Sequence, residues 1–239
     1  MQGKELLIDG INKIGLEIND NQVEKFMTYY EMLIEKNKVM NLTAITELDE
    51  VVVKHFLDSV LAAKVINLNK FDSLIDVGTG AGFPGIPLKI MFPHLKVVLL
   101  DSLNKRLNFL NEVIDKLGLE NIQTIHGRAE DIGHNVDYRE QFDLCVSRAV
   151  ANLSTLSEYC IPFIKKNGMF VSYKSEHSDE ETISAENAIK KLGGKITNTQ
   201  IIELPNSNMN RSFVCISKEN NTPKTYPRKA GVPTKKPLK

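Results

Sequence analysis

The sequence lacks the features that mark membrane, secreted and metal-binding proteins. No stretch of the 239 residues approaches the roughly 20 apolar residues of a membrane-spanning helix. Residues 1–10 mix basic and acidic side chains and hold no long apolar run, so we expect no signal peptide. The cysteines are few, far apart and in apolar contexts, with neither disulfide nor metal-ligand spacing: Cys145, Cys160 and Cys215. These absences predict a soluble, cytoplasmic protein with reduced thiols in its core and no metal.

The formal net charge is zero, but the charge is unevenly spread along the chain. Between Lys224 and Lys239 there are six basic residues and no acid, so the rest of the chain is acidic. This basic end indicates either a polyanionic partner or a solvated, disordered terminus. The 42% hydrophobic composition suits one α/β domain with an appendage. We expect a helical cap over 1–70, an α/β domain over 71–218 and a basic, proline-containing tail over 219–239.

Hydrophobic periodicity predicts a change of architecture near residue 70. Before it, apolar residues fall at helical spacing, with a helix start at Asn19 or Asp20 and a further helix over 47–66. After it, short apolar runs alternate with helical segments, which is typical of βαβ units and a parallel sheet. We expect strands at 73–77, 96–101, 122–126, 142–147 and 168–174, and helices at about 85–92, 104–117, 152–166 and 178–192.

The end of this series differs from its beginning. Two strand-like runs, 195–204 and 211–217, are joined by the short link 205–210 with no helix between them. So short a link requires antiparallel pairing, and we therefore expect a mixed sheet that ends in a C-terminal antiparallel β-hairpin. The composition after Lys218 turns polar and proline-rich, which indicates a tail rather than a core element.

The most informative stretch is LIDVGTGAGFPGIPL, over residues 74–88. An apolar run ends in Asp76, three glycines follow at every second position, and a proline-bearing segment then begins a helix. Glycines let a ligand approach bare backbone, and a helix start offers free N–H groups to an anion. Residues 80–85 also satisfy the dinucleotide pattern G-x-G-x-x-G, and Asp101 lies 21 residues after Gly80. The pattern alone therefore does not separate NAD from S-adenosylmethionine.

Three features favour S-adenosylmethionine. The carboxylate of Asp76 would attract the ammonium or sulfonium of that ligand and repel a pyrophosphate. The loop has no phosphate-binding lysine, which excludes a Walker A site. The final hairpin is unlike the second mononucleotide half of a dinucleotide-binding fold.

Further ligand contacts are expected where the next strands end. Asp101 ends the second strand, where an acid can accept hydrogen bonds from both ribose hydroxyls. It also stands where it would cap the following helix, and we favour the ribose role. After the third strand, Ala129 leaves room for a flat adenine ring and Glu130 offers a contact to its edge. An ordinary charged turn is an equal alternative there.

The loop after the fourth strand, over 147–151, is informative by what it lacks. It has no Asn/Asp-Pro-Pro-aromatic tetrad to hold an exocyclic amine and no cysteine to add to a pyrimidine. Arg148 is its only strong polar group, so we expect it to hold a phosphate or a guanine oxygen, with a surface salt bridge as the alternative. Positioning of an acceptor that is already nucleophilic would then carry most of the rate. His55 and Asp58 share one face of an expected helix, and such a pair is more often structural than catalytic.

These residues resemble the glucose-inhibited division protein B family, RsmG, from about residue 20 to the end of the chain. The resemblance implies a class I S-adenosylmethionine-dependent methyltransferase of Rossmann-like α/β fold, with 71–218 as its S-adenosylmethionine-binding methyltransferase domain. The implied substrate is N7 of one guanosine in the decoding-region loop of 16S rRNA, in the small ribosomal subunit or its precursor. The motifs that carry the resemblance are the run 76–88, Leu100-Asp101-Ser102 with Lys105-Arg106 and Phe109-Leu110, Arg128-Ala129-Glu130, Ser147-Arg148-Ala149, His55-Phe56-Leu57-Asp58-Ser59 and the tail 226–233.

The resemblance also implies site residues, and places Arg148 by the cofactor as well as by the RNA. Because the guanine N7 lone pair carries no proton, no acid–base residue is expected. The family contacts, together with the loop residues and Asp101, give the predicted cofactor set: Asp76, Gly78, Gly80, Gly82, Phe83, Asp101, Ala129, Glu130 and Arg148. The predicted RNA contacts are basic, because phosphate contacts dominate affinity for RNA: Lys165, Lys174, Arg211, Arg228 and Lys229.

Other functions share parts of this pattern. A methyltransferase for another RNA base or a small molecule has the same cofactor core, an NAD-binding oxidoreductase has the same glycine pattern, and an inactive RNA-binding module would have the same basic end. We expect a monomer that converts S-adenosylmethionine to S-adenosylhomocysteine. We also expect that trimming the chain after Lys218 lowers rRNA methylation and leaves cofactor binding nearly intact.

Overall fold

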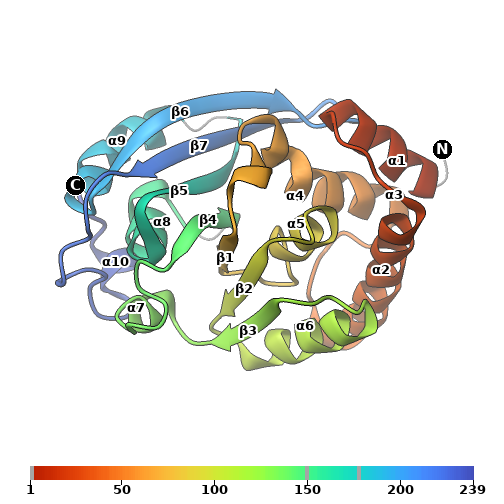
Figure 1. The fold of residues 1–239 in the computed structure, drawn as a ribbon, viewed down its shortest axis with the longest axis horizontal. Helices are drawn as coiled ribbons and strands as arrows, with labels where there is room; N and C mark the ends of the chain where they lie inside the picture. The colour runs from red at the N-terminus through yellow and green to blue at the C-terminus, as the bar shows by residue number, and fades with distance from the viewer. Residues whose placement is uncertain (1–2, 149–150, 177–178) are drawn as a thin grey trace.

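A seven-stranded mixed sheet forms the centre of the structure, a computed structural model that describes residues 3–148, 151–176 and 179–239 (Figure 1). The strand order in the described chain is β3-β2-β1-β4-β5-β7-β6. The first five strands are parallel, and β7 runs antiparallel to both of its neighbours, so the predicted hairpin is confirmed. The strands are β1 (Ser73–Val77), β2 (Lys96–Asp101), β3 (Ile122–His126), β4 (Phe142–Arg148), β5 (Ile164–Ser175), β6 (Gly194–Glu203) and β7 (Asn210–Lys218).

Helices cover both faces of the sheet, and alternate strand residues divide the core between the two faces. Leu74 and Leu99 belong to one buried cluster, with side chains of the N-terminal helices, α5 and α6, whereas Ile75 and Leu100 belong to another, with α8 and α9. Strands covered on both faces are apolar at successive positions, which explains the continuous apolar runs of the sequence. The covering helices are α5 (Gly85–Met91), α6 (Asn104–Lys116), α7 (Ala129–Ile132), α8 (Leu153–Cys160) and α9 (Asp179–Lys191).

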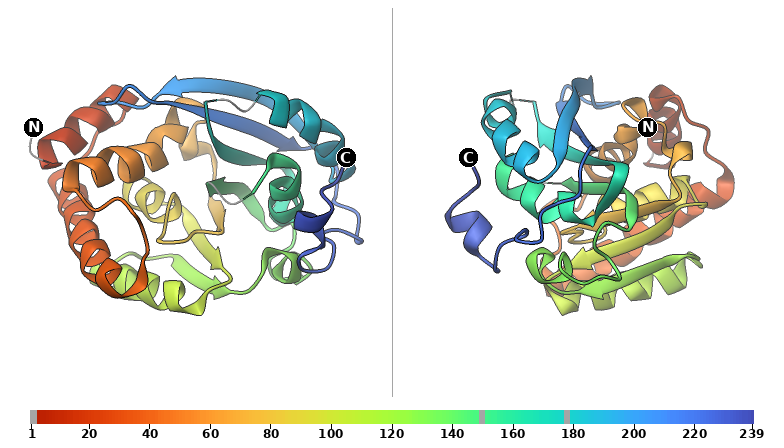
Figure 2. Two further views of the ribbon diagram at one scale, coloured as in Figure 1. Left: turned by 180° about the vertical axis from the view of Figure 1, so that it is seen from behind. Right: turned by 60° about the vertical axis from the view of Figure 1, so that its left-hand side comes forward.

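The N-terminal helices form a cap at one end of the sheet (Figures 1 and 2). The N-cap of α2 is Asn19, whose side chain accepts from the backbone of Gln22 while the Gln22 side chain accepts from the backbone of Asn19. Phe26, Tyr29 and Leu33 point from α2 into the core and are fully buried. The cap elements are α1 (Gly3–Ile14), α2 (Asp20–Met40), α3 (Leu48–Val51), the π-helix η1 (Val52–Leu57), α4 (Asp58–Val60) and the 3-10 turns η2 (Leu61–Lys64) and η3 (Leu68–Lys70).

Two helices differ in extent from the sequence prediction. The helix expected over 152–166 ends at Cys160 and passes through a 3-10 turn, η4 (Ile161–Phe163), into β5. Pro162 has no N–H and its ring would clash with the preceding turn, so the α-helix cannot continue. The helix expected over 47–66 consists instead of α3, η1, α4 and η2, and its π-helical part carries His55. Local π-helix is frequent at functional sites.

No helix in the described part of the chain is long and apolar enough to cross a membrane. The three cysteines are free and buried in the core, as expected from their apolar contexts.

The C-terminal segment, residues 219–239, packs against α7 and α8 and contains the short helix α10 (Val232–Lys235) (Figures 1 and 2). Thr222 and Pro233 are buried, so the prediction that this segment lies outside the core is wrong. Arg139 donates hydrogen bonds to the carbonyls of Thr222 and Tyr226, at 2.7 and 2.9 Å. The polar composition of the segment did not predict this packing. Many of the hydrogen bonds that hold the segment are accepted by backbone carbonyls, which every residue has. The division into three domains remains a prediction.

One ion pair fixes the segment to α8. Glu158 is fully buried, and its carboxylate accepts from the backbone N–H of Arg228 at 2.8 Å and from Nη2 of the same residue at 2.6 Å. Arg228 is therefore an internal partner of an acid rather than a free surface cation. Because a buried carboxylate without a partner is costly, this pair ties the folding of the segment to that of the domain.

We predict that Arg228→Ala lowers the free energy of unfolding by about 3 kcal/mol, because it leaves the Glu158 carboxylate buried and unpaired. Urea unfolding followed by circular dichroism measures the change. Lys229→Ala is the matched control, since Lys229 is exposed and its loss should change stability by less than about 0.5 kcal/mol. Equal stability of the two variants would contradict the prediction.

Candidate functional site

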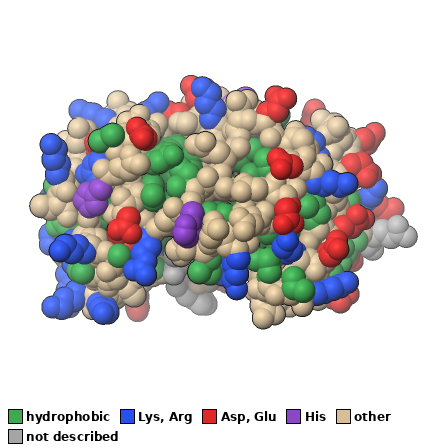
Figure 3. Space-filling model, turned by 90° about the horizontal axis from the view of Figure 1, so that it is seen from below, with side chains coloured by type: hydrophobic (Ala, Val, Ile, Leu, Met, Phe, Trp, Pro, Cys, Tyr) green, Lys and Arg blue, Asp and Glu red, His purple; other side chains and the backbone are tan. Residues whose placement is uncertain are grey.

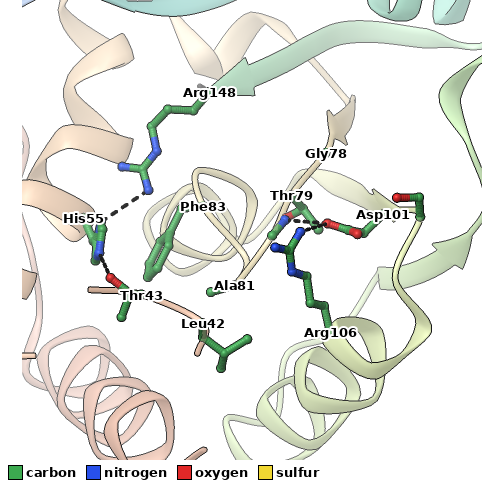
Figure 4. A pocket seen from close by; sticks show the side chains of 12 residues that line it. Leu42, Thr43, His55, Gly78, Thr79, Ala81, Phe83, Asp101, Arg106 and Arg148 are labelled. Carbon is green, nitrogen blue, oxygen red and sulfur yellow. Dashed lines mark hydrogen bonds and ion pairs between the residues drawn. The ribbon is translucent and has the colours of Figure 1, made fainter. Parts of the chain in front are cut away.

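Two adjoining cavities open where the parallel strands end. The larger has a volume of about 470 Å3 and lies between the glycine loop, the start of α6 and the cap helices (Figure 4). The smaller has a volume of about 340 Å3 and lies between the ends of β1 and β2 and the start of α7. Gly78, Asp101 and Ser102 line both cavities, so the two adjoin at these residues, and we call the pair of cavities the trough. In open α/β sheets, ligands bind at this carboxyl edge.

The glycine loop follows β1 and has left-handed backbone at each of its first three glycines. The φ angles of Gly78, Gly80 and Gly82 are 75°, 63° and 102°, in the region that side chains disfavour. Gly78 and Gly80 line the larger cavity. Gly82 instead faces the protein, because a Cβ there would lie 2.5 Å from the Tyr29 hydroxyl. This third glycine is therefore required by the packing of the cap against the loop.

We predict that Gly82→Ala destabilises the chain by about 3 kcal/mol, since it combines left-handed strain with overlap against the cap. Gly118→Ala is the matched control, because Gly118 also has a positive φ, 56°, but its Cβ would meet no described atom within 4 Å. The control should lose only about 1–2 kcal/mol. Denaturant unfolding of both variants separates strain from overlap, and a smaller loss for Gly82→Ala would refute this account.

Asp76 lies beneath the loop and is fully buried. Its Oδ2 accepts from the Thr79 hydroxyl at 2.7 Å and from the Gly85 N–H at 2.8 Å. Burial raises the pKa of this carboxyl to about 7, against the lowering effect of the two hydrogen bonds. Asp76 is not one of the described residues that line the two cavities. The structure therefore places it as a brace of the loop, and the predicted contact to a cationic ligand stays a prediction.

Asp101 stands at the boundary of the two cavities. Its Oδ2 accepts from the Gly80 N–H at 2.9 Å and is 3.3 Å from Nη1 of Arg106, while its Oδ1 accepts from the Leu103 N–H at 2.9 Å (Figure 4). Leu103, not Asp101, is the N-cap of α6. The carboxylate is thus held in place by backbone N–H groups at the point where the two cavities meet.

A charged and aromatic corner closes the larger cavity on the side of the cap. Phe83 lies against the imidazole of His55, with ring centroids 4.7 Å apart, and the guanidinium of Arg148 lies 5.2 Å from the Phe83 centroid. Arg148 also forms an ion pair with Asp58 at 2.7 Å, and Arg211 binds the other oxygen of that carboxylate at 2.6 Å. Asp58 is only 4% exposed, so the pairing is internal rather than a surface salt bridge.

His55 is held from both sides of its ring. Its Nε2 is 2.8 Å from the Thr43 hydroxyl, and its Nδ1 is 3.4 Å from Nη2 of Arg148 (Figure 4). Burial, together with the charge of Arg148, lowers the pKa of this imidazole to about 4. The ring is therefore neutral near pH 7, and its Nδ1 faces the Lys54 carbonyl at 3.1 Å as well as Arg148, while the Thr43 hydroxyl beside Nε2 can donate or accept.

We predict that His55 makes stability depend on pH between about 4 and 6.5. Its folded pKa is depressed, so below pH 6.5 the unfolded chain takes up a proton that the folded chain refuses until about pH 4. Relative to His55→Gln, the wild type should lose up to about 1.4 kcal/mol per pH unit as pH falls through this window. Thermal unfolding of both proteins across this pH range measures the difference in stability. Asp76 titrates in both proteins, so its contribution cancels from the difference. A difference that does not change with pH would contradict the prediction.

The smaller cavity brings together two further predicted residues. Ala129 and Glu130 begin α7 and line this cavity beside Gly78 and Asp101. Glu130 is 7% exposed, and its Oε1 accepts from the Gly231 N–H of the C-terminal segment at 2.9 Å. The expected adenine-side residues thus lie together, and Glu130 has a structural partner besides.

The predicted RNA-binding residues do not form one surface. Lys165 pairs with Asp143, which also binds Ser73 at the start of β1, so it lies at the sheet edge opposite the cavities. Lys174 is 11% exposed and pairs with Glu181 at 2.7 Å. Arg211 and Arg228 are held by buried acids, as described above. Lys229 is exposed on the C-terminal segment.

Several residues that line the cavities were not predicted from the sequence. Leu42 and Thr43, in the link between α2 and α3, reach the larger cavity, as does Arg106. Tyr159, Gly231 and Thr234 line the smaller one. Of these, only Arg106 belongs to one of the sequence motifs, Lys105-Arg106. Ala149, in the loop after β4, lies outside the described residues.

The sheet, its order and the trough at its carboxyl edge define the class I S-adenosylmethionine-dependent methyltransferase fold. The solved structure of a mutant of MtNAS in complex with S-adenosylmethionine matches with a TM-score of 0.55 and 14% identity, over 82% of this chain and 73% of that chain. TrmN from Thermus thermophilus matches with a TM-score of 0.51 and 15% identity, over 70% of this chain and 53% of that one. At such identities these likenesses show the fold alone.

Sequence comparison gives the family. The family model described as rRNA small subunit methyltransferase G matches residues 22–210. The chain is 52% identical to the ribosomal RNA small subunit methyltransferase G of Alkaliphilus metalliredigens over 239 residues, which cover 100% of both proteins. It is 51% identical to the protein of that name from Lachnoclostridium phytofermentans over 238 residues, with 100% of this chain and 98% of that protein covered. The chain belongs to the rRNA small subunit methyltransferase G family, as the sequence motifs predicted.

Proposed function

We propose that this protein methylates N7 of one guanosine in the decoding-region loop of 16S rRNA, with S-adenosylmethionine as the methyl donor. The observation that carries the proposal is the trough of two adjoining cavities at the carboxyl edge of the sheet. It brings the glycine loop, Asp101 and Arg148 together in a chain of this family. Membership in the family supports rRNA as the substrate, the resemblance of the sequence motifs implies N7 of a guanosine, and the chemistry of the site is compatible with that acceptor.

The residues of the trough fit this cofactor. Asp101 offers a carboxylate between the two cavities, where a ribose diol would be held. The smaller cavity, with Ala129 and Glu130, would then take the adenine, and the larger, with Gly78 and Phe83, the methionine end. When bound, the cofactor supplies an electrophilic methyl group on a sulfonium.

The acceptor side of the larger cavity supports positioning rather than proton transfer. The pKa of His55 is lowered to about 4, which makes its imidazole a weak base, and Arg148 is a cation paired with Asp58, so neither group is suited to remove a proton. Guanine N7 carries no proton in the neutral base and needs no base to attack. Arg148, held by Asp58, would orient a guanine oxygen or a phosphate while the flat surface of Phe83 and His55 limits how the acceptor approaches.

Exposed lysines of the C-terminal segment are the best candidates for RNA contact. Lys224, Lys229, Lys235 and Lys236 are all exposed. In Figure 3, lysine and arginine side chains gather toward the left-hand end, the side on which the C-terminal segment lies in Figure 1, and acids are more frequent toward the right. Such a gradient would orient a polyanion over the trough.

We infer a cytoplasmic monomer that acts on 16S rRNA in the small ribosomal subunit or its precursor.

We predict that loss of this protein removes one 7-methylguanosine from the decoding-region loop of 16S rRNA. Chemical strand scission at 7-methylguanosine, read by primer extension, locates the base in cells with and without the protein. Re-expression of the wild type should restore the scission, and Asp101→Ala should restore less than about a tenth of it, because the ribose contact and the loop support are both lost.

Two outcomes would change the proposal. A methyl group found on another base, with no effect on this guanosine, would favour the alternative of a methyltransferase with a different acceptor. Calorimetric binding of NAD without binding of S-adenosylmethionine would reject the proposed cofactor.

A further inference from the structure

The C-terminal segment forms one wall of the smaller cavity. Gly231 and Thr234 of this segment line it together with Tyr159 of α8 and with Val77 and Leu100 from the ends of β1 and β2. The segment therefore reaches the same cavity as Ala129 and Glu130, although it is about a hundred residues away in sequence. Figures 1 and 2 show the segment beside α7 and α8.

Three hydrogen bonds hold this wall against the domain. The Gly231 N–H donates to Glu130 Oε1 at 2.9 Å. The hydroxyls of Thr234 and Tyr159 are 2.8 Å apart. The buried hydroxyl of Thr155 donates to the Pro233 carbonyl at 3.1 Å. The position of the wall is thus set by residues on both sides of the cavity.

Anchors further along the segment fix its approach. Besides the Arg228–Glu158 pair, Nε2 of His134 lies 2.7 Å from the Pro227 carbonyl, and Thr222 is buried with its hydroxyl bonded to the Leu192 carbonyl at 2.7 Å. A solvated tail needs no such contacts. Their number and burial indicate a segment whose conformation matters to the cavity beside it.

We propose that residues 231–234 are part of the adenosine subsite, with the paired hydroxyls of Thr234 and Tyr159 as its polar contact to the adenine ring. Adenine presents an amino donor and ring-nitrogen acceptors on its edges, and a pair of hydroxyls can serve either. Thr234 is exposed, so it is free to meet a ligand that enters the cavity. This inference rests on the cofactor of the proposed function, and it reverses the expectation that trimming the chain leaves cofactor binding intact.

The test is calorimetric titration of the full chain and its variants with S-adenosylhomocysteine and with methylthioadenosine, which lacks the amino-acid end. Thr234→Val keeps the shape of the side chain and removes its hydroxyl, and it should weaken both ligands by a similar factor, about 3- to 10-fold. A chain that ends at Lys229 keeps Arg228 and its ion pair, and it should weaken both ligands more than 10-fold.

Lys235→Ala/Lys236→Ala is the matched control, because these lysines belong to the same segment and are exposed away from the lining of the cavity. It should bind both ligands with wild-type affinity. Thermal unfolding identifies a shortened chain that has lost its fold, and in that case the exposed Thr234→Val variant decides.

The outcomes separate this inference from the proposed function. Wild-type affinity of Thr234→Val for both ligands would overturn the hydroxyl contact, and wild-type affinity of a folded shortened chain would overturn the wall itself. A full chain that binds neither ligand would instead reject the proposed cofactor. Loss of affinity for S-adenosylhomocysteine alone would place the effect at the methionine end, against this inference.

Discussion

One buried carboxylate joins the three parts of this molecule. Asp58 comes from the cap, and its two oxygens are shared by Arg148, at the end of β4, and Arg211, in the C-terminal hairpin. A carboxylate that is 4% exposed must be paired, so the cap, the parallel strands and the hairpin are held in one arrangement. Arg148 is directed toward the larger cavity as a consequence. In the sequence, Asp58 was notable only as a neighbour of His55 on one helix face. In the structure, its carboxylate sets the geometry of the site.

The glycine loop is fixed in the same way, from outside and from beneath. The Tyr29 hydroxyl of α2 donates to the Ala81 carbonyl, and Asp76 binds the loop from below through Thr79 and Gly85. Burial raises the pKa of Asp76 to about 7, which is the cost of placing a carboxyl where it can hold two donors. The cap and the sheet share one hydrophobic cluster around this loop, so the loop is rigid because both are folded.

The sequence predicted the features that depend on residues close together in the chain. The strands, the loop and the hairpin follow from apolar runs, glycines and a short link, and the carboxyl edge of the sheet then placed Asp101, Ala129 and Glu130 around one trough. Properties that depend on distant partners were not accessible. Nothing near Arg228 in sequence indicates Glu158, and the alternation of the strands does not show that Asp76 turns under its loop. Likewise, Lys165 looks like any other basic residue until the sheet places it at the opposite edge.

The electrostatics of the acceptor corner bear on the kind of chemistry it can support. Arg148 and Arg211 supply two fixed positive charges, Asp58 offsets one of them, and His55 remains neutral because burial and the neighbouring Arg148 guanidinium lower its pKa to about 4. A base for proton removal at neutral pH would need a pKa near 7 and access to the ligand. Asp76 has such a pKa but is fully buried. His55 lines the larger cavity, but its pKa is too low. A nucleophile that carries no proton needs no such base. Guanine N7 is such a nucleophile, and it also gains a positive charge on methylation, which a corner where Asp58 offsets one of the two arginine charges tolerates better than one without that carboxylate would.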